Sequence, residues 1–518
     1  MKIALAKEMR AVDKEAIGSY GIVELALMES AGHRVAASAV QLLKTADKKS
    51  ICVLAGSGNN GGDALVAARY LSNFGARIKT FLIGNKDHRT ESLNAQIKVL
   101  RGMGIEIQEL ESDRAWERLK VTLRFSDLII DGVLGTGFSG ALRPSILRLV
   151  RLINPLNKTI VSIDVPSGVE ADTGQVSEAA INATCTVALG LPKIGHFICP
   201  GAEHTGKLIV DDIGIPAKLL NEEIHQTLLD SNLAVTLLPK RLKDVHKGSC
   251  GKILVIAGSR GMTGAASLAA MSALKAGAGL VTLAVPESLN SIFEVKLTEV
   301  MTAPLPEIKT GIIGGDQAVN QILTLSEKCD AILLGPGLGR ENETLEMVKK
   351  VVENVNKPLV LDADALYAYN GKIQDLKLRK QIPILTPHLG ELSALLGITI
   401  DELRRSLVET VRKAAQDIEA YIVAKFESTI VAYPNGEIFI SSLGNEGMAT
   451  GGVGDVLAGV IVGLTKQTPF APLAGVYIHG AAGDIAFAEK GEGLTAADVM
   501  NNVPAALKDL RRRQENLE

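Results

Sequence analysis

The sequence alternates between short apolar runs of β type and longer helical stretches, and this alternation occurs in two successive series. The first series has its apolar runs at residues 51–56, 78–84, 127–131, 159–165, 185–190 and 207–214. The second has them at residues 252–259, 280–286, 331–339, 358–366 and 384–388, and after two further β-type runs it ends in three helical stretches over residues 453–513. Strands that alternate with helices form doubly wound parallel sheets. The pattern therefore predicts the α/β class.

The length and composition predict two domains. A chain of 518 residues is too long for a single hydrophobic core. Hydrophobic residues make up 47% of the chain and aromatic residues only 3%, so the cores must consist of aliphatic side chains, as in buried parallel sheets. Residues 215–241 contain no clear strand. We therefore expect a first domain over residues 1–215, a connecting segment over 216–240 and a second domain over 241–518.

Charge and cysteine usage exclude several classes of protein. The net charge is -3, from 55 basic and 58 acidic residues, and no long basic stripe is present to bind nucleic acid. No apolar run approaches the roughly 20 residues that a membrane span needs. The five cysteines form no CxxC or Cys/His cluster, which argues against a disulfide framework or a zinc site. We expect a cytoplasmic enzyme and, from base rates, a homo-oligomer.

A glycine-rich motif follows the first apolar run. Residues 56–61 fit the GxGxxG pattern, and residues 59–63 read NNGGD immediately before a helical stretch. A helix N-terminus that follows a strand offers free backbone amides to an anion. An ordinary dinucleotide-binding domain also carries an acidic residue at the end of its second strand, where this chain has Gly84 and Asn85. The motif thus predicts phosphate binding but argues against hydride transfer with NAD in its standard pose.

Polar loops follow two further strands of the first series. They read DGVLGTG at residues 131–137 and DVPSG at residues 164–168. Because the carboxyl ends of adjacent parallel strands meet at one edge, Asn60, Asp131 and Ser167 could offer oxygen ligands to a hard cation such as potassium. Asp164 would then be free to move a proton. Each residue alone is equally well explained as a helix cap or turn residue, but their recurrence at successive strand ends favours a site.

A second glycine motif opens the first of the C-terminal helices. It reads TGGVGD at residues 450–455, so backbone amides there can form a nest for a phosphoryl group while Asp455 accepts the proton of an attacking hydroxyl. Glycines that only allowed close packing would leave Asp455 unexplained. Lys425 and the hydroxyl groups of residues 428–429 could contact nucleotide phosphates. His388 and the GPGLG loop at residues 335–339 end other strands on the same predicted rim.

Four stretches of the first half resemble the N-terminal, Rossmann-like domain of NAD(P)H-hydrate repair proteins, an NAD(P)HX epimerase with a three-layer α/β/α sandwich. They are NNGGD, DGVLGTG, SIDVPSG and LPKIGHFICPG, and the resemblance covers about residues 1–215. It implies that Asp164 contacts the hydrate and that Asn60, Asp131 and Ser167 hold K+. It also implies a substrate-binding set of Asn59, Asn60, Gly61, Gly62, Asp63, Gly135, Thr136, Gly137, Phe138, Ser139, Gly140 and Ala141. The family often has glycine where this chain has Ala64.

The second half resembles the C-terminal, ribokinase-like partner of the same proteins, the ADP- or ATP-dependent NAD(P)HX dehydratase. The motifs GPGLG, TPHLGE, KFEST and TGGVGDVLAG appear in the order of that family. The resemblance implies hydrate contacts from Ala265, Gly337, His388 and Asp455. It implies nucleotide contacts, with Mg2+ accompanying ADP or ATP, from Lys425, Phe426, Glu427, Ser428, Thr429 and Gly454. Leu389 and Val453 stand where relatives often have proline and serine.

The two resemblances together predict a bifunctional metabolite-repair enzyme. It would interconvert the R and S epimers of NAD(P)HX and dehydrate the S epimer to NAD(P)H, using ADP or ATP to activate the C6 hydroxyl. The chief alternative is a ribokinase-like kinase for a small molecule such as a vitamin alcohol, with the first half as an accessory binding module. A third possibility makes the first half a noncatalytic scaffold for a ligand or protein.

Overall fold

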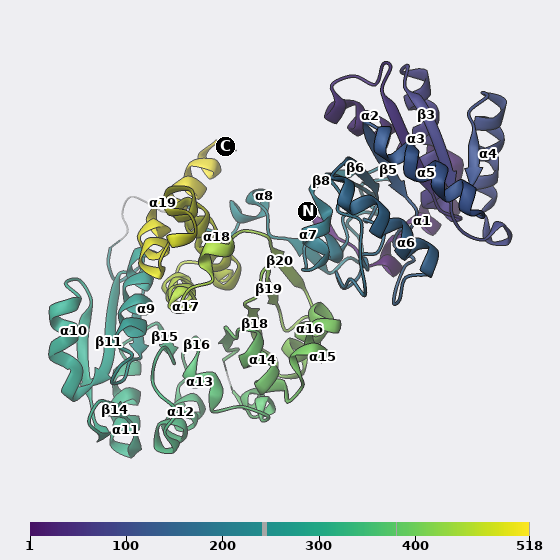
Figure 1. Cartoon of the computed structure of the whole chain (residues 1–518). Helices are drawn as coiled ribbons and strands as arrows, with labels where there is room; N and C mark the ends of the chain where they lie inside the picture. The colour runs from purple at the N-terminus through teal and green to yellow at the C-terminus, as the bar shows by residue number, and fades with distance from the viewer. Residues whose placement is uncertain (241–245, 380, 517–518) are drawn as a thin grey trace. The chain divides into compact units, whose positions relative to one another are not determined.

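The computed structural model describes residues 1–240, 246–379 and 381–516, and it divides the chain into two compact units (Figure 1). One unit is Lys2–Gln226, called here the N-unit. The other, the C-unit, comprises Thr227–Glu518 together with Met1. The first residues of the predicted second domain, 241–245, lie outside the described residues.

The N-unit is built on a seven-stranded sheet in which every neighbouring pair of strands is parallel. The strand order is β4-β3-β2-β5-β6-β7-β8. The chain therefore builds outward from β2 in one direction and from β5 in the other, and this switch point is where α/β sheets bind ligands. The strands are β2 (Ser50–Ala55), β3 (Arg77–Leu82), β4 (Ile107–Glu109), β5 (Leu128–Gly132), β6 (Thr159–Ile163), β7 (Cys185–Leu189) and β8 (Lys207–Asp211), and β1 (Lys2–Ile3) precedes them.

Helices cover both faces of this sheet. Ile51 and Val53 pack with α2, α3 and α4, whereas Cys52 and Leu54 point the other way and pack with α5 and α6. A strand that is buried on both faces must be apolar at every position, which explains the continuous run at residues 51–55. The helices are α1 (Ala6–Gly18), α2 (Glu24–Leu43), α3 (Asn59–Asn73), α4 (Glu91–Gly102), α5 (Asp113–Phe125), α6 (Pro144–Ile153) and α7 (Gly201–Thr205).

The C-unit contains a larger sheet with the order β9-β20-β19-β18-β17-β16-β15-β10-β11-β12. From β18 through β17, β16, β15, β10 and β11 to β12, neighbouring strands pair in parallel. Strands β18, β19 and β20 form an antiparallel meander. Strand β9 (Gln226–Leu228) lies in the connection where no strand was predicted. The others are β10 (Lys252–Ile256), β11 (Leu280–Pro286), β12 (Met301–Leu305), β15 (Ala331–Leu334), β16 (Leu359–Leu361), β17 (Ile384–Leu385), β18 (Tyr421–Ala424), β19 (Thr429–Ala432) and β20 (Ile438–Ser441), with a separate hairpin of β13 (Glu307–Lys309) and β14 (Ile312–Ile313).

The three predicted C-terminal helices form one layer of the C-unit with α9 (Thr263–Lys275). They are α17 (Val453–Leu464), α18 (Ala471–Lys490) and α19 (Ala496–Glu515). Helix α17 packs so closely on α9 that a side chain at Gly459 would overlap the carbonyl of Ala269. The other helices are α8 (Ser231–Ala234), α10 (Asn290–Lys296), α11 (Gly315–Ser326), α12 (Asn342–Asn354), α13 (Asp364–Tyr367), α14 (Leu389–Leu396), α15 (Ile400–Arg405) and α16 (Leu407–Asp417). The predicted α/β class is confirmed.

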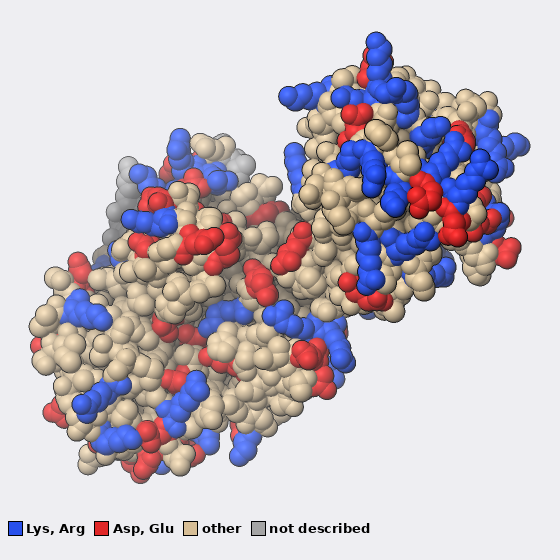
Figure 2. Space-filling view, viewed as in Figure 1, with Lys and Arg blue, Asp and Glu red and all other residues tan. Residues whose placement is uncertain are grey.

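Charged side chains of both signs are interspersed on the face of the molecule shown in Figure 2. In the part of the chain that the structure describes, no helix is both long and apolar enough to cross a bilayer. The same residues contain no group of three or more His, Cys, Asp or Glu side chains that could hold a metal ion.

Candidate active sites

The N-unit has a cavity of about 700 Å³ bounded by the ends of its central strands. Its wall is formed by the segments that follow β2, β5 and β6, together with one side of α1 and α2. The predicted residues that line it are Asn59, Asn60, Asp63, Gly135, Thr136, Gly137, Phe138, Ser139, Ala141 and Asp164. Gly61, Gly62 and Gly140 are not among the lining residues. Nor are Asp131 and Ser167, which are buried to 1% exposure.

The NNGGD motif forms the first turn of α3 itself rather than a loop before it, since Gly58 is the extended N-cap residue. A side chain at Gly61 would collide with the carbonyl of Gly56, and one at Gly62 would collide with the tip of Met28. These two glycines therefore allow the helix to approach its neighbours. Ala64 is also fully buried and packs against Gly132, where a second Cβ would lie only 2.7 Å away. The methyl group at position 64 is thus accommodated outside the cavity.

Asp131 is the centre of a buried hydrogen-bond network below the cavity. Its carboxylate accepts hydrogen bonds from Ser162 Oγ at 2.8 Å, from Ser167 Oγ at 2.6 Å and from the Ser167 backbone N at 3.0 Å. Burial raises the pKa of Asp131, and the bonds from Ser167 and Ser162 partly offset that rise. In the described residues no Lys or Arg forms an ion pair with this carboxylate.

The structure brings the three predicted cation ligands together through Leu134. Asn60 Nδ2 donates to the carbonyl of Leu134 at 2.6 Å, and the backbone N of Leu134 donates to Ser167 Oγ at 2.9 Å. Ser167 in turn bonds Asp131. Asn60, Asp131 and Ser167 therefore belong to one connected group at the ends of β2, β5 and β6.

Asp164 is fixed by a buried lysine. Lys193, whose side chain is 1% exposed, forms a short ion pair with Asp164 Oδ1 and donates to the carbonyl of Leu189 at 2.9 Å. The backbone of Asp164 has φ +64°, a left-handed conformation that aspartate tolerates better than most residues. His196 Nε2 bonds the Asp164 carbonyl at 2.8 Å, while its Nδ1 accepts from the Lys193 backbone N at 3.0 Å.

Other titratable groups surround this ion pair. Burial, followed by the charge of Lys193, lowers the pKa of His196 to about 4, so the ring is neutral. Its two hydrogen bonds connect the backbone of Asp164 to that of Lys193. Burial raises the pKa of Asp63 well above its usual range. Burial also raises the pKa of Asp13, on α1, to about 6. Sequence reasoning assigned no role to Lys193, His196 or Asp13. The first two lie in the LPKIGHF stretch that carried the resemblance, whereas Asp13 has no motif around it.

In the C-unit, the glycine motif is the start of α17. Gly452 is its N-cap residue with φ +95°, and Asp455 lies in the first turn. Burial, and then the neighbouring charge of Asp362, raise the pKa of Asp455 to about 7. The buried ring of His479 bonds the carbonyl of Val453 at 3.0 Å, which fixes this turn to α18. Asp455 is therefore a partly buried carboxyl with a pKa near neutrality, on a helix turn that is bonded to α18.

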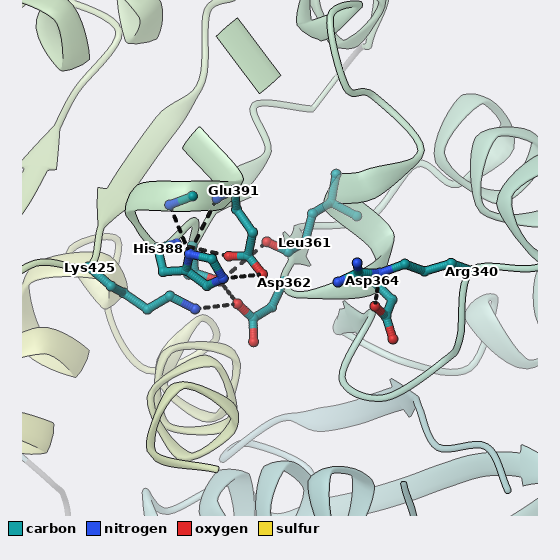
Figure 3. Close-up of polar contacts among 9 residues, drawn as sticks. Arg340, Leu361, Asp362, Asp364, His388, Glu391 and Lys425 are labelled. Atoms are coloured by element: carbon teal, nitrogen blue, oxygen red, sulfur yellow. Dashed lines mark hydrogen bonds and ion pairs between the residues drawn. The ribbon is translucent and has the colours of Figure 1, made fainter. Parts of the chain in front are cut away.

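Lys425 lies beside this turn and is held by a different aspartate (Figure 3). Its ammonium group pairs with Asp362 Oδ1 at 2.8 Å, and Thr386 Oγ1 donates to the same oxygen at 2.7 Å. Burial alone would lower the pKa of Lys425, but the charges of Asp362, Glu391 and Asp455 raise it. A Cβ at Gly454 would lie 3.1 Å from Lys425 Nζ, so the predicted nucleotide contacts Lys425 and Gly454 adjoin each other.

His388 is the N-cap residue of α14. Its Nδ1 accepts hydrogen bonds from the backbone N of Gly390 at 3.0 Å and of Glu391 at 3.3 Å. Glu391 reaches back to the His388 backbone N at 2.8 Å and lies 3.4 Å from Nε2 (Figure 3). With 59% of its side chain exposed, the capped ring keeps its Nε2 edge available at the rim. Leu389 is the first residue of the helix, a position where proline is also compatible.

The remaining predicted hydrate contacts lie together at the ends of β10 and β15. A Cβ at Gly337, whose φ is +62°, would lie 3.2 Å from the Cβ of Ala265, so these two residues adjoin. Nearby, Arg340 Nε donates to Asp364 at 2.8 Å, and its guanidinium group lies 4.7 Å from the centre of the Tyr367 ring. Sequence reasoning missed Asp362, Asp364 and Arg340, although the first two belong to the DAD run at the end of β16.

The KFEST motif forms the turn between β18 and β19. Phe426 is half-buried, Glu427 is exposed and faces Arg404 at 3.3 Å, Ser428 is 8% exposed, and Thr429 begins β19. Of these residues only Lys425 is placed beside Asp455 by the contacts described above. The turn nevertheless belongs to the same rim, because Lys425 and His388 form a parallel bridge.

The fold and the two sites define a two-domain α/β enzyme with a carboxylate site at the strand ends of each unit. A family model described as YjeF-related protein N-terminus matches residues 24–195, and one described as NAD(P)H-hydrate dehydratase matches residues 253–505. The first falls within the N-unit and the second within the C-unit.

Two relatives match over the whole of this chain. The bifunctional NAD(P)H-hydrate repair enzyme Nnr of Moorella thermoacetica is 38% identical, and that of Thermofilum pendens 40%; each match covers 100% of this chain and 98% of the relative. The ADP/ATP-dependent NAD(P)H-hydrate dehydratase of Bacillus subtilis, crystallised with ATP and Mg2+, is 28% identical, covers 55% of this chain and 98% of its own, and has a TM-score of 0.48. The chain belongs to the family of bifunctional NAD(P)H-hydrate repair enzymes, as the sequence predicted.

Proposed function

We propose that the two units divide the repair of hydrated nicotinamide dinucleotides between them. The N-unit interconverts the R and S epimers of NAD(P)HX, and the C-unit dehydrates the S epimer with ADP or ATP. The single observation that best supports this division is that each unit carries a carboxylate at its site. Asp164 follows β6 and lines a cavity of about 700 Å³, and Asp455 lies in the first turn of a glycine-capped helix. The family match of both halves supports the same division.

Dehydration in the C-unit begins with proton removal from the C6 hydroxyl of the substrate. Asp455 is the acceptor, because its pKa of about 7 lets it take and release a proton under physiological conditions. The first amides of α17 and the ammonium group of Lys425 neutralise the charge of the transferred phosphoryl group. A phosphorylated oxygen leaves more readily than hydroxide. Loss of phosphate from C6, followed by loss of a proton from C5, then restores the C5=C6 double bond. Ala265, Gly337 and His388 contact the hydrate in this arrangement.

A magnesium ion fits this rim only together with the nucleotide. Mg2+ is usually bound by one or two carboxylates, several waters and the phosphates of the substrate. Asp362 and Asp364 are the available carboxylates, but each already bonds a cationic side chain, Lys425 and Arg340 respectively. When bound, Mg2+ would neutralise phosphate charge, and Lys425 to Thr429 with Gly454 would hold the nucleotide.

The N-unit site suits the hydrate and a monovalent cation. Asp131 is a buried carboxyl whose partners are hydroxyls and amides, so K+ would supply a positive charge to this network, with Asn60 and Ser167 as further oxygen ligands. Asn59 to Asp63 and Gly135 to Ala141 would contact the dinucleotide, with Asp164 at the hydrate. Replacing potassium by sodium should slow epimerisation and leave dehydration of the pure S epimer unchanged. Equal epimerisation rates in both salts would remove K+ from the proposal.

The first experiment gives the purified chain a mixture of both NADHX epimers with ADP, ATP or neither. Recovery of near-ultraviolet absorbance from both epimers, dependent on nucleotide, is expected. The Asp455→Asn variant should recover nothing, and the Asp164→Asn variant only the S epimer. A stable phosphorylated alcohol as product would instead indicate a small-molecule kinase. Unchanged epimer interconversion in Asp164→Asn would indicate a binding scaffold. We also propose a cytoplasmic homo-oligomer, which light scattering of the purified chain and cell fractionation test.

A further inference from the structure

One wall of the N-unit cavity comes from α1, outside the strand-end loops that carry the motifs. Met9, Arg10, Asp13 and Ile17 all line the cavity. Residues spaced by three or four along a helix share one face, so this stripe is the side of α1 that faces the cavity. Asp13 is the carboxyl on that stripe.

Asp13 has no structural duty that explains its position. It lies inside α1 rather than at a cap, and its half-buried carboxyl has neither a hydrogen bond nor an ion pair with any residue that the structure describes. The charged groups that influence it are Lys193, Asp164 and Glu24, while Arg10, Asp63 and Arg143 also line the cavity. Asp13 is therefore an unpaired carboxyl at the cavity wall, within reach of the charges of the Asp164–Lys193 pair.

The position of Asp13 is tied to the Asp164 site through the backbone. Ala4 pairs with Lys193 in a parallel bridge, and the Ala4 backbone N donates to the carbonyl of Pro192 at 2.9 Å. Helix α1 begins two residues later, where the backbone N of Ala6 donates to Asp172 at 2.5 Å. The segment of Pro192 and Lys193, which holds Asp164, is therefore bridged to the residue that leads directly into the helix carrying Asp13.

Inversion at C6 by loss of the hydroxyl and return of water requires proton transfer at both faces of the ring. A proton must reach the departing hydroxyl as the C6–O bond breaks, and the ring nitrogen then shares its lone pair with C6 to leave a cationic C=N bond and one water. A water on the opposite face forms the new C6–O bond and gives its proton to a base. One proton moves from one group to another, no atom changes its oxidation state, and no co-reactant is consumed.

We propose that Asp13 and Asp164 are the two groups that exchange these protons, one at each face of the hydrated ring. This assignment rests on the proposed epimerase function of the N-unit and adds a catalytic residue to it. Asp164 is held in place beside the ammonium group of Lys193, and we assign it as the base for one direction. Asp13 lacks such a partner and begins as the acid.

The proton affinity of Asp13 suits this role. Burial raises its pKa to about 6, with a smaller contribution from the charge of Asp164 and an opposing one from Lys193. A general acid works best when its pKa is near the operating pH. Both protonation states of Asp13 are therefore populated under conditions in which the enzyme acts.

The test uses the full chain, purified R or S NADHX and no nucleotide, in water enriched in oxygen-18. Asp13→Asn should slow epimer interconversion by about 100-fold, a typical contribution of one acid–base group. It should still exchange the C6 oxygen of one epimer with retention of configuration, because Asp164 continues to serve its own face. Asp164→Asn should also slow interconversion, and it should still exchange the C6 oxygen of the other epimer. Glu15→Gln, an exposed position on the same helix, is the matched control.

Three outcomes overturn the assignment of Asp13. They are interconversion at the wild-type rate in Asp13→Asn, loss of both interconversion and oxygen exchange in that variant, and an equal loss in Glu15→Gln. The second outcome would mean that Asp13 only shapes the cavity. Failure of the wild-type chain to interconvert the epimers would instead remove the proposed epimerase function, so the two failures are distinguishable.

Discussion

The two sites use the same pair of residue types in opposite ways. In the N-unit, Lys193 pairs directly with Asp164, the carboxylate proposed to act on the substrate. In the C-unit, Lys425 lies beside the helix turn of Asp455 but pairs with Asp362. Asp164 is thereby held beside a positive charge, whereas burial and then the neighbouring carboxylate of Asp362 raise the pKa of Asp455 to about 7.

This difference shows that the chemical role of a carboxyl depends on whether a nearby lysine pairs with it or with another carboxylate. An aspartate bound to an ammonium group keeps its charge and its position, which suits a fixed electrostatic contact or a base. An aspartate that shares a rim with a second carboxylate exchanges its proton near neutrality, which suits an acceptor that must be reset in every turnover. Four substitutions test the comparison, in order of expected effect.

The largest effect is expected from Asp455→Asn. The amide cannot accept the substrate proton, so dehydration of the S epimer should fall by about 10³-fold. Epimer interconversion should not change, because Asp455 belongs to the C-unit alone. Both rates can be measured on the same preparation. Asp316→Asn, a change at an exposed aspartate of the C-unit, serves as the control and should retain full activity. A comparable loss in that control would contradict the assignment.

Lys193→Met should remove the ion pair that holds Asp164 in the N-unit site. Asp164 would become a largely buried carboxylate without its counter-charge, and removal of one partner of such a pair costs about 3–5 kcal/mol of stability. Epimerisation should fall by about 100-fold. Chemical denaturation of the variant measures the first effect and epimer interconversion the second.

The double variant Lys193→Met with Asp164→Asn sharpens this test. It should regain part of the lost free energy of unfolding, because the unpaired charge is gone, but it should not regain activity. Lys207→Met, at an exposed position of β8, provides the control. Equal stability of the single and double variants would show that the ion pair is not what holds Asp164.

Asp362→Asn should allow Lys425 to pair with Asp455, as Lys193 pairs with Asp164 in the N-unit. It removes a negative charge that raises the pKa of Asp455, and it releases Lys425 to approach Asp455. The wild-type dehydration rate should rise with pH through about 7, as Asp455 loses its proton. In the variant this rise should occur at lower pH, with a drop in kcat of about tenfold because Lys425 is misplaced. An unshifted pH–rate profile would contradict the proposed coupling.

The smallest effect is expected from Gly454→Ala. The added methyl group would lie 3.1 Å from Lys425 Nζ, a distance that the flexible end of the lysine can relieve by a small shift. The KM for the nucleotide should rise by about threefold, less than 1 kcal/mol, with little change in kcat. Nucleotide titrations at saturating substrate measure it. A tenfold fall in kcat would show that residue 454 acts on the reacting groups rather than on the lysine.

The sequence predicted the sheets and the strand ends better than it predicted the interactions at those ends. Alternating apolar runs located the central strands, and the motifs located Asp131 and Ser167 near the ends of β5 and β6 and Asp455 at a helix start, because local patterns encode local structure. The partners of the lysines lie on other strands, as in Lys193 with Asp164 and Lys425 with Asp362. No local pattern records such a pairing, which depends on how the strands are ordered in the sheet.

The glycines illustrate the same limit. The NNGGD motif correctly indicated a helix N-terminus, although the helix begins at Asn59 rather than after the motif. The sequence could not show that Gly61 and Gly62 face neighbouring backbone and side chains. The same glycine motif can form a phosphate-binding nest or allow a close packing contact. Only the direction in which a Cβ would point distinguishes these two roles. The proposed ligand roles of these two glycines remain predictions.

The left-handed backbone of Asp164 limits how this position can vary among descendants of the chain. At φ +64° the residues with the least strain are glycine, asparagine and aspartate. Glutamate, the usual conservative exchange for aspartate, would keep the carboxylate but strain the main chain. Asparagine would keep the main chain and lose the charge. A saturation library at this codon should therefore rank asparagine above glutamate for protein abundance and leave neither with epimerase activity, so that fold and catalysis are selected by separate properties of one residue.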